Sequence, residues 1–108
     1  MIDKTSSPDT TAQRLFVQAV KHHTDGNLPQ AQAHCNKVLA IDPRHVGTLT
    51  NLGILAMKFR QPELAVELMQ KAVQIEPESA QCHRNLGIAR FEQTGFRGAI
   101  VGLDRSLA

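Results

Sequence analysis

The chain repeats itself with a period of 34 residues. The tetrapeptide Asn-Leu-Gly-Ile at Asn51–Ile54 returns at Asn85–Ile88, and the same offset relates Pro43 to Pro77. A fixed period of this length is typical of proteins that stack one small structural unit repeatedly. Such a stack builds its core unit by unit and offers an extended surface, so the period favours a binding protein over an enzyme.

Composition narrows the classes of function further. The 108 residues suffice for one small domain, and the net charge of +2 gives no strong attraction to nucleic acid or to an anionic membrane. The N-terminus lacks the apolar stretch of a secretion signal, and no apolar run approaches the roughly 18 residues of a membrane span. Cys35 and Cys82 stand in different repeats without a CxxC pair, which favours reduced, packed thiols. These features predict a cytoplasmic protein that binds neither nucleic acid nor membrane.

The hydrophobic spacing predicts helices and no sheet. Apolar and small residues recur at helical intervals, as they do over residues 49–56. We expect Ser79 to cap a helix, and Thr94-Gly95 to turn the chain into the last helix. After a flexible leader at residues 1–9, six helices are expected, over residues 10–24, 28–41, 45–59, 62–75 and 79–93 and from Phe96 onward.

Small residues recur at two places in the period. They are Ala19, Gly53 and Gly87 in the first helix of each unit, and Ala31, Ala65 and Ala99 in the second. Small side chains at both places allow two helices to cross closely. Glycine costs about 1 kcal/mol relative to alanine inside a helix, so Gly53 and Gly87 need a packing reason. We therefore expect the same close crossing in all three units.

The repeated unit resembles the tetratricopeptide repeat, a helix–turn–helix of 34 residues. The resemblance is carried by recurrent small and apolar residues and by closing prolines: Leu15, Ala19, Gly26, Ala31 and Pro43, then Leu49, Leu52, Gly53, Ala56, Ala65, Ala72 and Pro77, then Leu86, Gly87, Ala99 and Leu103. It implies an all-α domain over residues 10–108, a right-handed superhelical stack of antiparallel helix hairpins known as an α-solenoid. The three units would span residues 12–45, 46–79 and 80–108, the last of them incomplete.

The sequence departs from the family pattern in several places. His22 and Arg90 stand where the family prefers tyrosine or alanine, and His83 stands where it prefers a large apolar residue. The third unit also ends before its closing proline and has no following helix to cover its last face. We expect either that the chain is the N-terminal part of a longer protein, or that a second copy covers the open edge Phe96–Ala108.

The resemblance places a binding groove on the first helices of the units, which line a concave face that commonly holds an extended peptide in this family. Helical spacing puts ten residues on this face: Gln13, Val17, Val20, Asn51, Ile54, Lys58, Gln81, Asn85, Ile88 and Glu92. Asn51 and Asn85 occupy the same place in successive units, and an amide can bind a peptide backbone of any sequence. This pair resembles the start of the asparagine ladder in O-linked N-acetylglucosamine transferases, although Val17 interrupts it. The alternative is that both asparagines cap structure or bind water.

The sequence contains none of the familiar catalytic or metal-binding patterns. It lacks a glycine-rich phosphate loop, a nucleophile elbow and an HExxH motif. Its histidines and cysteines do not have the spacing of metal ligands, and we expect the histidines to lie at or near the surface. We therefore expect no catalytic residue, no metal and no cofactor.

The leading prediction is a non-catalytic scaffold that binds an extended peptide or a partner helix in its groove. The alternatives are a self-association module and the N-terminal, substrate-recruiting part of a larger enzyme, such as a glycosyltransferase or methyltransferase. RNA binding, as in pentatricopeptide arrays, is disfavoured by the 34-residue period and the low charge. A clamp for acidic chaperone tails is disfavoured because Phe16, Val20, Gln81 and Asn85 stand where the other clamp residues belong.

Overall fold

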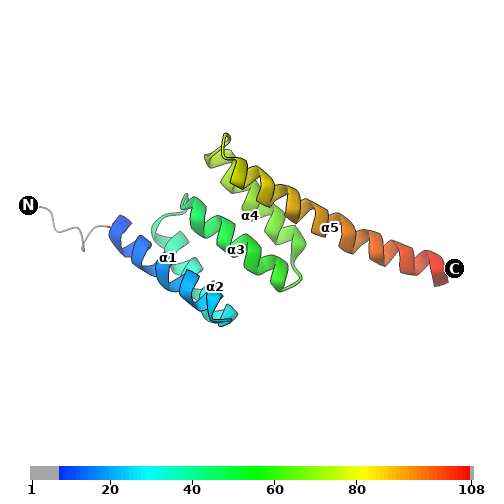
Figure 1. Cartoon of the computed structure of the whole chain (residues 1–108), viewed down its shortest axis with the longest axis horizontal. Coiled ribbons are helices and arrows are strands. Elements are labelled where there is room, and N and C mark those ends of the chain that lie inside the picture. The colour runs from blue at the N-terminus through cyan, green and yellow to red at the C-terminus, as the bar shows by residue number, and fades with distance from the viewer. Residues whose placement is uncertain (1–7, 108) are drawn as a thin grey trace, which may run out of the picture.

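The computed structural model describes the backbone of residues 8–107 and the side chains of residues 11–95. It contains five helices, α1 (Pro8–Thr24), α2 (Leu28–Ile41), α3 (Val46–Lys58), α4 (Pro62–Ile75) and α5 (Ala80–Leu107), and residues 8–107 include no strand. Helices α1 and α2 form one antiparallel hairpin, α3 and α4 form a second, and α5 packs on α4 (Figure 1). The expected all-α stack of antiparallel helices is therefore confirmed.

The helix ends follow local chemistry. Helix α4 begins with Pro62. The second helix of each hairpin ends just before a proline, which is Pro43 after α2 and Pro77 after α4. The expected cap at Ser79 is confirmed, since the N–H of Cys82 donates to its hydroxyl oxygen at 3.2 Å. The ring of His45 caps α3 by accepting from the N–H of Thr48 at 3.1 Å. These ends fix where each hairpin turns.

Both hairpins turn through the same hydrogen-bonded cap. At the end of α1 the N–H of Gly26 donates to the carbonyl of His23 (3.1 Å), and at the end of α3 the N–H of Arg60 donates to the carbonyl of Met57 (3.0 Å). Each turn contains one residue in the left-handed conformation, with φ of 82° at Gly26 and 60° at Arg60. This pattern is the Schellman cap, which requires a positive φ just after the helix.

The expected sixth helix and the turn at Thr94-Gly95 are wrong, because α5 continues unbroken to Leu107. The left-handed place that Gly26 and Arg60 occupy in the first two turns falls on Thr94 one period later. A β-branched residue strongly disfavours positive φ, and the glycine stands one position too late. The prolines at the starts of α2 and α4 also have no counterpart after residue 95.

Packing gives a second reason for the long α5: the face that would receive a further helix is polar. In α3 the residues that face α4 are Leu49, Gly53 and Ala56, all of them buried. The same places in α5 hold His83, Gly87 and Arg90, all of them exposed. Covering His83 and Arg90 with a further helix would remove water from two polar side chains, which costs free energy unless that helix supplies hydrogen-bond partners. Between residues 80 and 95, α5 therefore keeps a solvated outer side.

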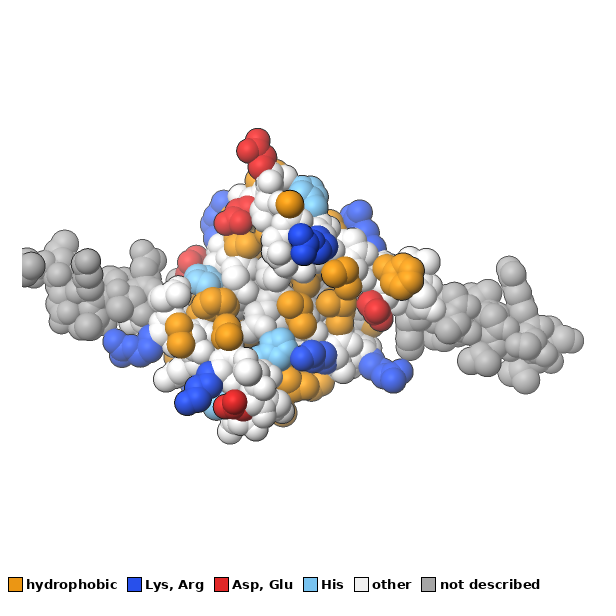
Figure 2. Space-filling view, in the orientation of Figure 1, with side chains coloured by type: hydrophobic (Ala, Val, Ile, Leu, Met, Phe, Trp, Pro, Cys, Tyr) orange, Lys and Arg blue, Asp and Glu red, His pale blue; other side chains and the backbone are white. Residues whose placement is uncertain are grey.

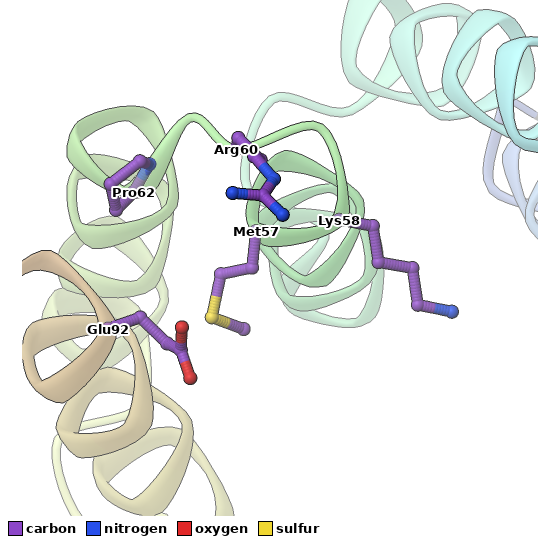
Figure 3. Close-up of a pocket in the computed structure, with 5 residues that line it drawn as sticks. All are labelled: Met57, Lys58, Arg60, Pro62 and Glu92. Atoms are coloured by element: carbon purple, nitrogen blue, oxygen red, sulfur yellow. The ribbon is translucent and has the colours of Figure 1, made fainter. Parts of the chain in front are cut away.

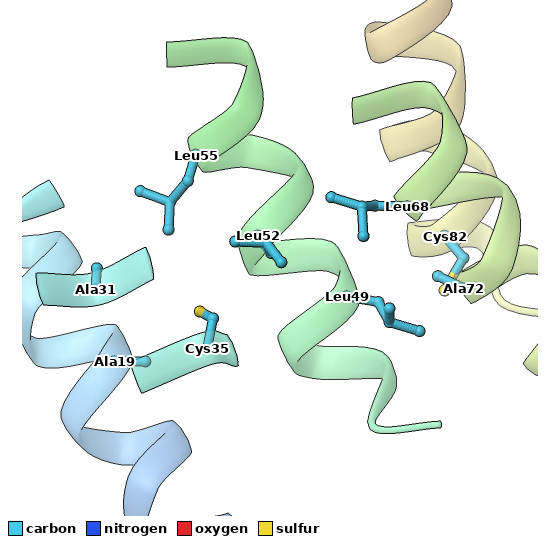
Figure 4. Packing of buried hydrophobic residues seen from close by; sticks show 9 residues of the cluster. All are labelled: Ala19, Ala31, Cys35, Leu49, Leu52, Leu55, Leu68, Ala72 and Cys82. Carbon is cyan, nitrogen blue, oxygen red and sulfur yellow. The ribbon is translucent and has the colours of Figure 1, made fainter. Parts of the chain in front are cut away.

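The core consists of two apolar clusters, and α3 contributes residues to both. The first joins α1 and α2 to α3 and α4, and Figure 4 shows Ala19, Ala31 and Cys35 on one side of α3 with Leu68 and the α4–α5 contact on the other. The second joins α3, α4 and α5 through Ala56, Ala65, Val66, Met69, Leu86 and Ala89. Helix α3 is therefore the central element, and its position aligns the helices on either side of it.

The close crossing predicted from the small residues exists in two hairpins but not at Gly87. A Cβ added to Gly53 would lie 2.7 Å from Cε of Met69, which is fully buried. In the first hairpin the corresponding residues are Ala19 and Cys35. In both hairpins the smaller residue of the pair stands on the first helix and the larger residue on the second. A Cβ on Gly87 would have no neighbour within 4 Å, because no helix crosses α5 there. Ala99, the expected partner of Gly87, lies beyond the described side chains.

Candidate binding face

Helices α1, α3 and α5 form one side of the stack, which we call the first-helix face; α2 and α4 lie behind it (Figure 1). The ten residues predicted for the groove lie on these three helices. Seven of them are exposed, Ile54 is half-buried, and Asn51 and Asn85 are buried. Figure 2 shows this side, with hydrophobic side chains gathered near its centre and charged side chains around them.

The exposed part of the first-helix face includes several apolar side chains. Val17 is 57% exposed, Val20 41% and Ile88 47%, although branched aliphatic residues are usually buried. Phe91, one turn after Ile88, is the most exposed large apolar residue described at 75%. Burying such side chains against a partner releases about 25 cal/mol per Å² of apolar surface. The face therefore has a source of binding free energy.

The amide of Asn51 is engaged within the protein. Its Oδ1 accepts a hydrogen bond from Nδ1 of His23 at 2.6 Å, and its Nδ2 donates to Sγ of Cys35 at 3.7 Å. Nε2 of His23 in turn accepts from Nζ of Lys58 at 2.7 Å. Because the ammonium can only donate and the amide oxygen can only accept, this ring is neutral with its proton on Nδ1. The chain of contacts ties the end of α1 to α3 and α2.

Asn85 has a different environment from Asn51. Its Oδ1 accepts from Nε2 of Gln81 at 3.4 Å, while its buried Nδ2 has no partner among the described residues. The partners of Asn51 are His23 and Cys35. The residues that stand in the same places relative to Asn85, 34 positions later, are both methionines. The two asparagines therefore share a place in the repeat but not a hydrogen-bonding role.

A pocket of about 380 Å³ lies between the end of α3, the α3–α4 turn and α5. It is lined by Met57, Lys58, Arg60, Pro62 and Glu92, and it brings together two of the predicted groove residues, Lys58 and Glu92 (Figure 3). In Figure 3 the side chain of Lys58 points away from Glu92, as its contact with His23 requires. The pocket lining thus combines the charged side chains of Arg60 and Glu92 with apolar atoms of Met57 and Pro62.

Sequence reasoning missed three residues that share one place in the period: His23, Met57 and Phe91. His23 contacts Asn51, Met57 lines the pocket and Phe91 is exposed on α5. Each stands one turn after Val20, Ile54 or Ile88, so extending the predicted line by three residues would have found them. Arg60 could also have been recognised, because the 34-residue offset places it where Gly26 stands.

The thiol of Cys35 is buried, and its burial raises its pKa from 9.0 to about 11, against a smaller opposing effect of the Asn51 hydrogen bond. A protonated, enclosed thiol is a poor nucleophile and a poor metal ligand. Among the described residues, His, Cys, Asp and Glu side chains form no group of three or more that could hold a metal ion. In the same part of the chain, no helix has the length and apolar character that crossing a bilayer needs.

Antiparallel helix hairpins stacked with a constant period define the class of helical-repeat proteins. The family model of the tetratricopeptide repeat matches residues 22–87, more than half of the chain, and the protein belongs to that family. Tetratricopeptide repeats generally mediate protein–protein interactions, and the family typically provides non-catalytic scaffolds. This membership agrees with the resemblance noted in the sequence.

Proposed function

We propose that the first-helix face binds an extended segment of a partner protein. The observation that carries this proposal is the set of exposed apolar residues, Val17, Val20, Ile88 and Phe91, on the two outer helices of the face. Half-buried Ile54 lies on α3 between these helices and can join them into one surface. Exposed apolar residues that gather on one face are typical of interaction sites.

Polar groups on the same face support an extended ligand. Gln13 and Gln81 are exposed, and each carries donors and an acceptor for a peptide backbone. The amide of Asn51 is already engaged, so its contribution is to hold α1, α2 and α3 in register. The asparagine ladder of the sequence prediction is thereby reduced in this proposal to Asn85 and the exposed glutamines.

The proposal can be tested with a phage-displayed library of random peptides selected on the immobilised protein. Ile88→Asp and Val20→Asp each place a charge where apolar contact is expected, and each should weaken the selected peptides by about tenfold or more. Leu64→Asp is the matched control, because Leu64 is 38% exposed but lies on α4. It should leave the affinity unchanged. Equal binding by all three variants and the wild type would contradict the proposal.

A further inference from the structure

Opposite charges stand unpaired across the α3–α5 pocket. Neither the guanidinium of Arg60 nor the carboxylate of Glu92 has a hydrogen-bond or ion-pair partner among the described residues, although both residues line the same pocket. Lys58, the other cation of the pocket, is engaged by His23 at 2.7 Å. A ligand group that carries a positive charge therefore finds one free carboxylate, and a group that carries a negative charge finds one free guanidinium.

The floor of the pocket suits the stem of a long side chain. Met57 lies between the two charges in Figure 3, Pro62 adds apolar atoms to the lining, and the methionine is flexible enough to adapt to a ligand. Long basic side chains bury their methylene groups on apolar surface while the charged head remains in a polar site. The pocket volume of about 380 Å³ lies within the range of ligand sites, roughly 300–1,000 Å³.

Arg60 holds an unfavourable backbone conformation at the edge of this pocket. Its φ of 60° makes it the one non-glycine residue with positive φ in the described chain, and glycine occupies the same place in the first turn. Glycine adopts this conformation at a lower cost in free energy than arginine, so the backbone alone gives no reason for an arginine here. Strained residues are often found at binding sites, where the side chain has a role that offsets the strain.

We propose that this pocket reads the charge pattern of the bound segment. A lysine or arginine side chain of the partner lies over Met57 and Pro62 with its head on Glu92, and a neighbouring acidic side chain of the partner binds Arg60. This inference rests on the proposed function, because it assumes a peptide on the first-helix face. It adds the substrate class, namely segments in which a basic and an acidic residue stand close together.

The experiment uses the same phage-displayed random library on the full chain and on charge variants. Glu92→Lys should lose the enrichment of basic residues and weaken the peptides selected on the wild type by about tenfold, because an attraction becomes a repulsion. Arg60→Glu should lose the enrichment of acidic residues. Glu67→Lys is the matched control, because Glu67 is exposed on α4 away from the pocket, and it should retain the wild-type preference.

The outcomes separate this inference from the proposed function. The selected peptides could depend on Ile88 but show the same charge preference on wild type and on Glu92→Lys. This result would contradict the role of the pocket in reading charge, and binding on the first-helix face would stand. An enrichment of purely acidic peptides by the wild type would likewise overturn the role of Glu92. A selection that enriches no peptide overturns both. Circular dichroism of each variant confirms that the helices remain folded.

Discussion

Replacing Gly53 and Gly87 by alanine should change stability in opposite directions, although the two residues occupy the same place in the repeat. Gly87 is exposed in α5, and an added Cβ meets nothing within 4 Å. Gly87→Ala should therefore gain the helix propensity of alanine, about 1 kcal/mol. At Gly53 the added methyl group would lie 2.7 Å from Cε and 3.1 Å from Sδ of Met69.

The magnitude follows from the difference between the two sites. Gly53→Ala gains the same propensity of about 1 kcal/mol, but overpacking a buried site typically costs about 1–3 kcal/mol. The atom that must move is the end of the flexible Met69 side chain, but Met69 is fully buried and must find that space within the core, so we expect a net change between about zero and 2 kcal/mol of destabilisation. The propensity cancels when the two variants are compared, and their difference of about 1–3 kcal/mol isolates the contact with Met69.

Urea unfolding followed by far-ultraviolet circular dichroism gives both free energies, and the slope of the transition shows whether the same surface is exposed in each variant. A double variant, Gly53→Ala with Met69→Cys, recreates the Ala19 and Cys35 pair of the first hairpin. The two changes should couple favourably, because the smaller thiol makes room for the methyl group. Stabilisation by Gly53→Ala equal to that by Gly87→Ala would refute the tight crossing. Strong destabilisation by Gly87→Ala would refute the five-helix arrangement.

Three further predictions concern the turn, the polar contacts and the thiol. Arg60→Gly should stabilise the fold by about 0.5–1 kcal/mol, because the left-handed cost for arginine exceeds the extra unfolded-state entropy of glycine; a lower melting temperature would contradict this. His23→Ala should destabilise by about 1–3 kcal/mol in urea unfolding, because it leaves the Asn51 oxygen without a partner, and an unchanged midpoint would show that the contact is dispensable. Cys35 should resist alkylation by iodoacetamide at neutral pH until the chain is unfolded. Because burial raises its pKa from 9.0 to about 11, the folded thiol keeps a proton that the unfolded chain loses, so stability should fall between these pH values.

The sequence predicts the first four helices closely, because each turn contains a strong local signal. Proline follows the ends of α2 and α4 and opens α4, and Gly26 supplies the left-handed residue of the first turn. The prediction is wrong at Thr94-Gly95 because a glycine alone is not sufficient for a turn. The exact position of the glycine matters, because the residue that would need a positive φ is the threonine before it. The polar residues His83 and Arg90 depart from the family pattern, but their effect on helix packing follows only once the neighbouring helices are placed.

The arrangement of the first-helix face was only partly predictable. Helical periodicity correctly put exposed residues such as Val17 and Ile88 on first helices, because exposure on a helix follows its 3.6-residue turn. Periodicity cannot show that the amide of Asn51 is hydrogen-bonded to His23 and Cys35, since those contacts join residues 28 and 16 positions apart. The pocket likewise depends on a loop residue, Arg60, that no helical stripe contains.

The solvated outer side of α5 also bears on polymerisation. A solenoid whose two ends are both apolar can add copies head to tail, and such a contact repeats without closing into a ring, giving a filament. His83 and Arg90 break this complementarity at one end of the described helices, because a docking copy would have to dehydrate both of them. Replacing His83 with leucine and Arg90 with alanine should remove this barrier at α5 and favour self-association through that side.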